Sequence, residues 1–324
     1  MSSGSSQFVV PQRTTAAQHT RPTSTNVVNM AITNNWIVHL RLNRFDNATK
    51  EDAQMDPVTE AIKRRYSCRN YSEAPLSPKV VQQIEALLEG SHTGPFGNTV
   101  RFKLLDFGQD GARSGRLGTY GFIRNARMFV AGAVRPAEQY LTDYGYCLER
   151  VVLALTRLDL GTCWLAATFD RARLKAQFGL AAGEAIPAVT PVGYPADGKT
   201  VVGHLIRLMA RSDKRRPWPD LFHETASGQP LSPEAAGAYS EALECVRLAP
   251  STANRQPWRV FANVEDEVFD FYARGKPSVD LGIAMLHFEQ AAEEAGLKGE
   301  WSRREAARPG LTYVATWRAG VAAE

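Results

Sequence analysis

Two diverged copies of one pattern run through the sequence, and this internal repeat restricts the fold more than any other feature. The tetrapeptide Pro-Leu-Ser-Pro starts at Pro75 and again at Pro230, 155 positions later (230 − 75). A second set of matches shares an offset of 137 positions (301 − 164): Asp143, Gly145, Leu160 and Trp164 match Asp280, Gly282, Leu297 and Trp301. The period is far longer than the roughly 20–50 residues of a solenoid repeat. Two similar halves instead predict a fused pseudo-dimer.

The repeat also predicts how the two halves meet. A helix is expected over residues 143–158, and its apolar residues cover more than one face. A helix that is apolar on most sides is buried in a core or an interface. Its second copy starts at Asp280, so we expect the two helices to pack together about a pseudo-twofold axis, as equivalent surfaces do in a C₂ dimer. The Ser-Pro pair in each tetrapeptide is expected to start another helix, and strands are expected over 100–107, 128–134 and 186–194.

Composition excludes several classes of protein. The chain has 324 residues, 44% of them apolar and 22% charged, as in soluble globular proteins. The net charge of +4 is small and the basic residues are scattered, so we expect no nucleic-acid partner. No apolar run approaches the ~18 residues that a membrane span needs, so we expect no membrane partner. These features favour a cytoplasmic protein.

The chain divides into three expected parts. Residues 1–54 are rich in Ser, Thr, Gln and Asn, and no acidic residue precedes Asp46. This composition fits a disordered tail or an upstream extension of the gene model. It is also found in organelle transit peptides, but the basic amphipathic helix that some of them form is not evident. We expect residues 55–217 to form the first half and residues 218–324 the second, shorter half.

A short segment near the start of the first half places two arginines and a hydroxyl on one face. Arg65, Ser67 and Arg69 alternate, so in an extended chain their side chains point the same way. Guanidinium forks fit the oxygens of a phosphate or a polarised carbonyl. A solvated basic edge is the alternative interpretation. Arg215, in the basic run 211–217, is expected to reach the same anion, although charge runs are commonly solvated.

The second half has a polar loop where the first half has a Gly/Pro-rich one. Residues 249–259 contain Pro250 and Pro257, which fix their own φ. The loop also contains short polar residues that favour turns: Ser251, Thr252 and Asn254. It fits either a helix-to-strand turn or a surface for a planar polar ligand. Because the second half has no counterpart of Arg65–Arg69, one complete site per chain is expected if the two parts meet.

Residues for other chemistries are absent or isolated. The sequence has no HExxH, GxSxG, GxxxxGK or GxGxxG motif. The six histidines are isolated and the four cysteines lie far apart, so we expect no metal site and no disulfide framework. We interpret Cys163 as a packing residue, since no His or Asp lies near it in the sequence to activate it. An enzyme without an acid–base pair usually takes its reactivity from a cofactor.

Three motifs together resemble those of the FMN-dependent nitroreductases, and most closely their single-chain form with two fused halves. The residues from Arg64 to Tyr71 are similar to the family's Arg-x-Ser-x-Arg/Lys-x-Phe/Tyr motif. Those from Leu160 to Ala167 are similar to its Gly-Leu-Gly-Thr-Cys-Trp segment, and those from Ala249 to Trp258 to its Ala-Pro-Ser-x-x-Asn-x-Gln-Pro-Trp loop. The resemblance spans about residues 55–320. It implies an α+β fold, with a central, mostly antiparallel sheet flanked by helices and FMN between the halves.

The resemblance also implies roles for individual residues. Arg65 and Arg215 would contact the FMN phosphate, and Ser67 the ribityl chain. Arg69 would be the catalytic residue, facing the N1–C2=O edge of the flavin. The other implied cofactor contacts are Tyr66, Trp164, Leu165, Ala166 and Ala167 in the first half, and Pro250, Ser251, Thr252 and Asn254 in the second. Ala166-Ala167 replaces the family's common Gly-Gly, which leaves the acceptor class open.

The implied reaction is a ping-pong oxidoreduction. NAD(P)H would give a hydride to flavin N5, and an electron-poor small molecule, such as a nitroaromatic or a quinone, would then take the electrons. One alternative is an FMN-binding protein without turnover, used for sensing or storage. Another is a different flavin reaction on the same fold, such as dehalogenation. We expect a monomer that acts as an intramolecular pseudo-dimer with about one FMN per chain.

Overall fold

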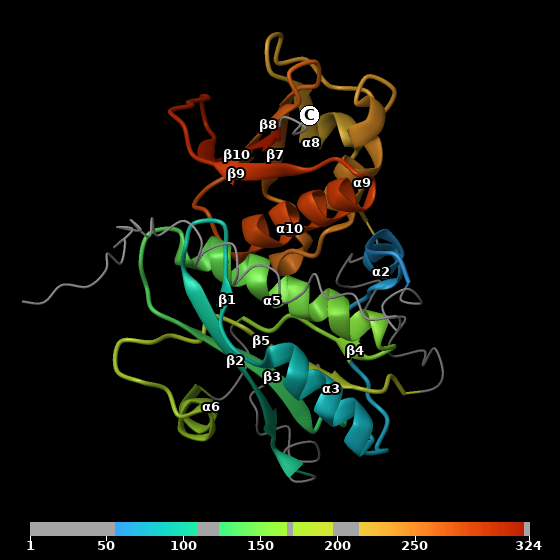
Figure 1. Ribbon diagram of the computed structural model, residues 1–324, viewed down its shortest axis with the longest axis vertical. Coiled ribbons are helices and arrows are strands. Elements are labelled where there is room, and N and C mark those ends of the chain that lie inside the picture. Colours follow the sequence, from blue (N-terminus) through green and yellow to red (C-terminus); the bar gives the residue numbers. More distant parts are fainter. Residues whose placement is uncertain (1–55, 109–122, 167–170, 197–213, 321–324) are drawn as a thin grey trace, which may run out of the picture. The chain divides into compact units, whose positions relative to one another are not determined.

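The computed structural model describes residues 56–108, 123–166, 171–196 and 214–320 (Figure 1). The expectations for residues 1–54, for Ala167 and for residues 211–213 of the basic run lie outside these ranges. All described residues belong to one compact unit. Within it, the helices and strands follow each other as two sets, one for each copy of the repeat.

The first set builds an antiparallel sheet with helices packed around it. Its elements are α2 (Val58–Arg64), α3 (Pro78–Leu88), β1 (His92–Thr93), β2 (Thr99–Asp106), β3 (Met128–Val134), α5 (Tyr140–Arg157), β4 (Gly161–Thr162), α6 (Arg171–Phe178) and β5 (Val189–Gly193). The five strands join in the order β1-β2-β3-β5-β4, and every pairing is antiparallel. The expected strands over 100–107 and 128–134 are confirmed. The one expected over 186–194 is shorter and covers only Val189–Gly193.

The second set builds a second sheet with the same arrangement. Its elements are α8 (Trp218–Leu221), β6 (Phe222–Glu224), η2 (Gly237–Tyr239), α9 (Ser240–Leu248), η3 (Thr252–Asn254), β7 (Trp258–Asn263), β8 (Val268–Ala273), α10 (Val279–Glu294), β9 (Gly299–Ser302) and β10 (Thr312–Ala319). The strand order is β6-β7-β8-β10-β9. Apart from the parallel pair β6–β7, all pairings are antiparallel. The expected α+β fold is confirmed, with one mostly antiparallel sheet in each half.

The second Pro-Leu-Ser-Pro keeps its cap but does not start the expected helix. The hydroxyl of Ser77 accepts a hydrogen bond from the Val80 N–H at 3.3 Å, and α3 follows. The hydroxyl of Ser232 accepts one from the Ala235 N–H at 3.1 Å in the same way. The chain then makes turns and η2, and α9 begins only at Ser240. Gly237 has a φ of +55°, which an α-helix does not accommodate, so the expected helix is wrong at this position.

The two long helices, α5 and α10, pack against each other as the repeat predicts (Figure 1). A Cβ atom on Gly145 would lie 2.1 Å from the Val279 carbonyl oxygen, and one on Gly282 would lie 1.8 Å from that of Thr142. Val279 and Thr142 are themselves 137 positions apart (279 − 142). Each glycine therefore meets the repeat equivalent of the residue that the other glycine meets. Both helices are buried along most of their length. The expected pseudo-twofold contact is therefore confirmed.

A matching pair of hydrogen bonds extends the repeat to the loops of the two halves. Asp143 accepts one from the Phe96 N–H at 2.9 Å, and Asp280 accepts one from the Thr252 N–H at 3.0 Å. Burial raises the pKa of both carboxyls, and these backbone hydrogen bonds act in the opposite direction. Each half therefore anchors its loop on an aspartate in the first turn of its long helix.

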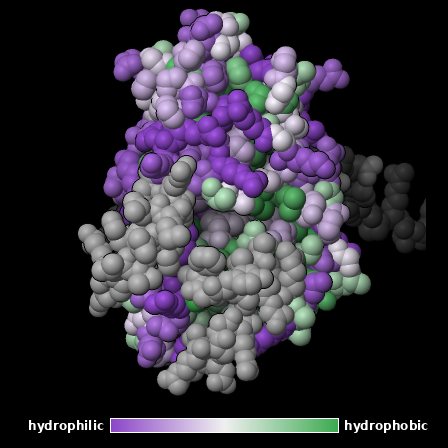
Figure 2. Space-filling model, turned by 180° about the vertical axis from the view of Figure 1, so that it is seen from behind, coloured by the Kyte–Doolittle hydropathy of each residue, from purple (hydrophilic) through white to green (hydrophobic). Residues whose placement is uncertain are grey.

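The surface and the cysteines agree with a packed, polar-faced protein. On the face seen in Figure 2, hydrophilic residues cover most of the upper part, which belongs to the second half. In the described part of the chain, no helix combines the length and the apolar character that crossing a membrane requires. All four cysteines are free and buried. Burial raises the pKa of the Cys163 thiol, which fits the packing role expected for it.

Candidate functional site

The segment with two arginines lies beside the first-half tryptophan segment. The chain leaves α2 at Arg65 in a non-helical conformation, with a φ of −58° and a ψ of 132°. Ser67 forms a parallel bridge with Thr162 of β4, and the Cys68 N–H donates to the Thr162 carbonyl at 2.8 Å. The extended conformation expected here is therefore confirmed. It brings Ser67 close to the residues that lead into Trp164.

The side chain of Arg65 is buried and only partly paired. It is 5% exposed, and its Nε lies 3.9 Å from Oε1 of Glu149. Its Nε and Nη1 are buried and have no hydrogen-bond partner among the described residues. Leaving buried donors unsatisfied costs about 1–3 kcal/mol each, and more when they are charged. The N–H donors of Arg65 that lack an acceptor therefore fit an anionic group such as a phosphate.

Glu149 connects the site to the second half. This fully buried carboxylate accepts a hydrogen bond from Trp164 Nε1 at 2.6 Å through Oε2. Its Oε1 lies 2.9 Å from Nε2 of His287 on α10. His287 Nδ1 lies 2.9 Å from the carbonyl of Cys245 on α9, and because a carbonyl only accepts, Nδ1 carries a proton. The Glu149–His287 contact joins α5 to α10, and the same carboxylate contacts Trp164 and Arg65.

The second-half loop is tightly held and strained. Three of its residues, Ala253, Asn254 and Gln256, have φ values of 50°, 53° and 50°. This region is costly for residues other than glycine, and such strain persists only where the surroundings enforce it. Here Arg215 donates to Asn254 Oδ1 at 3.0 Å and to the Leu248 carbonyl at 2.8 Å. Strained loops of this kind are common at ligand sites.

The expected site residues fall into two groups in the structure. Arg65, Ser67 and Arg69 lie with Trp164 and Glu149 in the first half. Charges on Arg69 and Arg65 both act to lower the pKa of Cys163, against the larger effect of burial, so both arginines lie near the segment that contains Cys163 and Trp164. The second group is the loop with Pro250, Ser251, Thr252 and Asn254. It leaves from α9, which also contacts α2 and α10.

Individual side chains within these groups differ in exposure. Tyr66 is 45% exposed and is the one exposed large hydrophobic residue in the described ranges. Ala166 is also exposed. Leu165, in contrast, is buried, and its backbone pairs with Val189, so the structure shows a packing role for it. The roles of all the expected site residues as cofactor contacts, those of Leu165 and Arg215 included, stay predictions.

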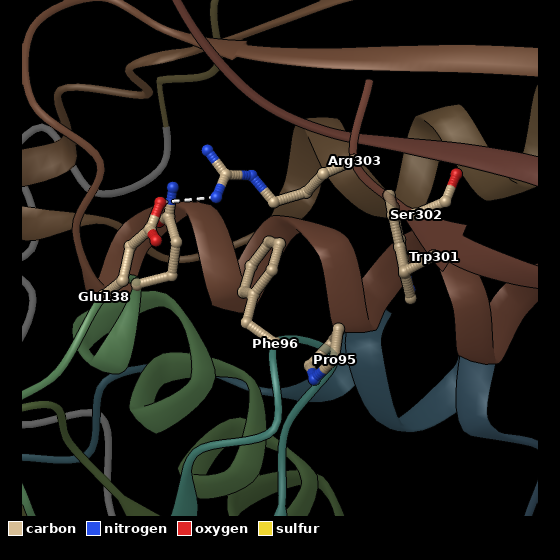
Figure 3. A pocket seen from close by; sticks show the side chains of 7 residues that line it. Pro95, Phe96, Glu138, Trp301, Ser302 and Arg303 are labelled. Carbon is tan, nitrogen blue, oxygen red and sulfur yellow. Dashed lines mark hydrogen bonds and ion pairs between the residues drawn. The ribbon is translucent and has the colours of Figure 1, made fainter. Parts of the chain in front are cut away.

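A cavity at the pseudo-equivalent position shows how the halves diverged. It has a volume of about 340 Å³ and is lined by Pro95, Phe96, Glu138, Gln139, Trp301, Ser302 and Arg303 (Figure 3). Trp301 occupies the repeat position of Trp164, and its Nε1 donates to Glu289 at 2.6 Å. Tyr146 donates to the same carboxylate at 2.5 Å from the other half. Arg303 forms an ion pair with Glu138 across the cavity, as the dashed line in Figure 3 shows.

The sequence did not predict the part played by Glu149 and His287. The six histidines are isolated in the sequence, and no motif includes Glu149. A signal was available: Glu149 is a carboxylate within a stretch of helix that is otherwise mainly apolar. A charged residue at such a position is buried only if it is paired. Its partner could not be found from the sequence, because it comes from the opposite half.

The comparison with known protein families identifies the chain. Its residues 57–292 match the family model described as "Putative TM nitroreductase". The chain belongs to this nitroreductase family. No curated protein sequence matches it.

One solved structure shows the same fold as this chain, and two others match less than half of its length. A "putative nitroreductase" from Thermotoga maritima is 21% identical, with a TM-score of 0.53, and the match covers 82% of this chain and 94% of that one. A nitroreductase in complex with FMN from Desulfovibrio desulfuricans is 23% identical over 46% of this chain and 95% of that one, with a TM-score of 0.35. An FMN-dependent nitroreductase from Clostridium difficile is 16% identical over 43% and 88%, with a TM-score of 0.36.

Proposed function

We propose that this nitroreductase-family protein is an FMN-dependent oxidoreductase. It would pass electrons from NAD(P)H through FMN to an electron-poor acceptor such as a nitroaromatic or a quinone. The observation that carries the proposal is the buried Arg65 guanidinium with two unfilled donors, in the segment that also presents Ser67 and Arg69. Family membership supports it. Two similar solved structures are described as FMN-dependent or as containing FMN.

The residues present fit the cofactor. Arg65 would hold the phosphate through its unfilled donors, and Ser67 would bond the ribityl chain. Arg69 would place its positive charge at the N1–C2=O edge, where negative charge develops on reduction. When bound, FMN supplies hydride acceptance at N5 and electron delivery to the acceptor. Glu149 would fix the positions of Trp164 and Arg65, so the protein's own contribution is to bind, orient and tune.

One cofactor per chain is part of this proposal. The pseudo-equivalent cavity has Trp301 in place of Trp164 but an Arg303–Glu138 ion pair within it. The second half also has no counterpart of the Arg65–Arg69 segment. Of these two pseudo-equivalent positions, only the one at Arg65 therefore offers buried guanidinium donors without an acceptor. A monomer would then contain a complete site, since its second half supplies what a partner subunit would otherwise provide.

Reconstitution and two half-reactions test the function. The purified protein should bind FMN, and NADH or NADPH should bleach the bound flavin without oxygen. A nitroaromatic or a quinone should then restore the oxidised absorbance. Failure to bind FMN would remove the basis of the proposal. Binding without reduction by either donor would favour a storage or sensing protein.

A further inference from the structure

The two halves differ in how the outer faces of their sheets are covered. In the first half, Leu174 and Phe178 of α6 pack into an apolar cluster on the sheet. Lys103 of β2 donates to the carbonyl of Phe178, the last residue of α6, at 2.8 Å, so its ammonium group is paired with the end of this helix. In the second half, residues 303–311 connect β9 to β10 without a helix. The corresponding sheet face therefore lacks a counterpart of α6 in the described ranges.

An open cavity lies on this face of the second sheet. Its volume is about 450 Å³, and it is lined by His223, Arg259, Phe261, Arg274, Gly275, Pro309, Gly310 and Leu311. These residues come from β6, from β7, from the end of β8 and from the connection between β9 and β10. Arg259 lies 156 positions after Lys103 (259 − 103), at the equivalent place in the repeat. The cavity is thus lined by a cation whose counterpart in the first half is bonded to the end of α6.

Arg259 is a buried guanidinium with free donors. It is 5% exposed. Its Nη1 donates to the carbonyls of Gln256 and Trp258. Its Nε and Nη2 make no hydrogen bond in the part of the chain that the structure describes. Burial, together with the charges of Arg274 and Arg216, lowers the pKa of Arg259 to about 10, so it remains charged at neutral pH.

The charges around the cavity are mainly positive. Arg274 is exposed and has no ion-pair partner among the described residues. Arg308 lies over the ring of Phe261, with Cζ 3.6 Å from the ring centroid. The carboxylate that acts on Arg259 is that of Asp220, which lies 3.9 Å from Arg216 Nη1. Asp270, on the neighbouring strand, forms an ion pair with Arg304. The cavity therefore favours an anion of more than one charge.

We propose that this cavity binds the phosphate group of a small-molecule ligand. Arg259 offers the Nε–Nη2 edge of its guanidinium group, which matches the oxygens of a phosphate, and Arg274 adds a second, exposed cation. A phosphate needs only part of the cavity, so the rest of the ligand lies against Phe261 and Leu311. The site is separate from the Arg65 segment, and the proposal does not depend on the proposed function.

Calorimetric titration of the full chain with inorganic phosphate tests the site. The protein is saturated with FMN and the unbound FMN is then removed, so that the donors of Arg65 are occupied and no free flavin phosphate competes. Chloride keeps the ionic strength constant. We expect saturable binding with one phosphate per chain. Arg274→Gln should weaken it roughly tenfold, as expected for the loss of one charged hydrogen bond. Arg259→Gln should abolish it.

Matched variants separate a built site from general electrostatics. Arg318→Gln removes the same charge from an exposed position on β10, and phosphate affinity should be unchanged. Arg65→Gln, titrated without FMN, should retain the phosphate site whether or not the chain binds flavin. Absence of binding to the wild type would overturn the proposal. Equal weakening by Arg318→Gln and Arg274→Gln would do the same, and Arg274→Gln decides the matter if Arg259→Gln does not fold.

Discussion

Glu149 is the residue through which the second half reaches the candidate site. Its carboxylate contacts Trp164 and Arg65 from its own half and His287 from the other. Glu289 plays the matching part at the diverged cavity, where it accepts from Trp301 and Tyr146. The positions of His287 and Arg150 correspond in the repeat, and Arg150 donates to Tyr146. The cluster around Glu149 therefore lies at the proposed flavin site, whereas the matching cluster around Glu289 lies at the diverged cavity.

Replacing Glu149 tests this difference. Glu149→Gln keeps the shape but leaves His287 and Arg65 without a carboxylate. We expect FMN affinity to fall roughly tenfold and stability to fall by about 3 kcal/mol, since breaking a buried pair is costly. Glu289→Gln is the control and should destabilise the protein without changing FMN affinity. Fluorescence titration with FMN and chemical denaturation measure both, and an equal effect on FMN affinity would contradict the assignment.

The two arginines of the extended segment have separable roles. Arg65→Ala removes the buried donors and should mainly weaken FMN binding. Arg69→Ala should mainly slow reduction by NAD(P)H and lower the flavin potential, because positive charge near N1 favours the reduced ring. Stopped-flow reduction and potentiometry of the FMN-bound variants distinguish the two. An unchanged potential and reduction rate in Arg69→Ala would show that the role given to Arg69 is wrong.

At the scale of elements, the close contact of α5 and α10 depends on two glycines. Gly145→Ala would place a methyl group 2.1 Å from a backbone oxygen of α10. The nearest atoms all belong to the backbone, which cannot move aside as the end of a flexible side chain can. We expect a loss of about 2 kcal/mol or more. Gly320→Ala is the control, since its methyl group would meet only Lys298 O at 3.8 Å. Equal melting temperatures for the two variants would contradict the close helix contact.

The connection after α6 is held to β2 by an acid-sensitive ion pair. Arg101 donates to both carboxylate oxygens of Glu184, at 2.9 and 2.5 Å. The hydrogen bonds from Arg101 lower the Glu184 pKa from 4.5 to about 2. Because the folded pKa lies below the unfolded one, the stabilisation is complete above pH 4.5 and is lost as the pH falls towards 2.

Melting curves at several pH values check this pair. Glu184→Gln should melt below the wild type at neutral pH, and the difference should shrink between about pH 4.5 and pH 3. Glu85→Gln, at an exposed position on α3, should match the wild type throughout. A difference for Glu184→Gln that does not change with pH would mean that the ion pair is not its source.

Elements with a strong local pattern were predictable from the sequence, and elements decided by the other half were not. The apolar run of β3 and the long apolar helix α5 carry their own signals, and both are confirmed. Ser232 has the same capping signal as Ser77, but Gly237 interrupts the helix that should follow. The Glu149–His287 contact joins residues 138 positions apart, and no local pattern identifies such a pair.

At the scale of the whole molecule, the repeat explains why two sheets with matching strand order share one chain. The halves meet through equivalent surfaces of α5 and α10, and their loops are anchored on Asp143 and Asp280. The halves differ in the side chains that they offer to a ligand. The first half has the buried Arg65, and the second half has the strained loop and the arginine-lined cavity. Duplication thus accounts for the architecture, and divergence accounts for a single proposed flavin site.

The number of FMN molecules bound per chain tests this account most directly. Native mass spectrometry of the purified, FMN-saturated protein gives the oligomeric state and the stoichiometry together. We predict a monomer with one FMN, which Arg65→Ala loses and Arg303→Ala retains. Two FMN molecules per chain, or FMN bound only by a dimer, would contradict the claim that the two halves complete one site.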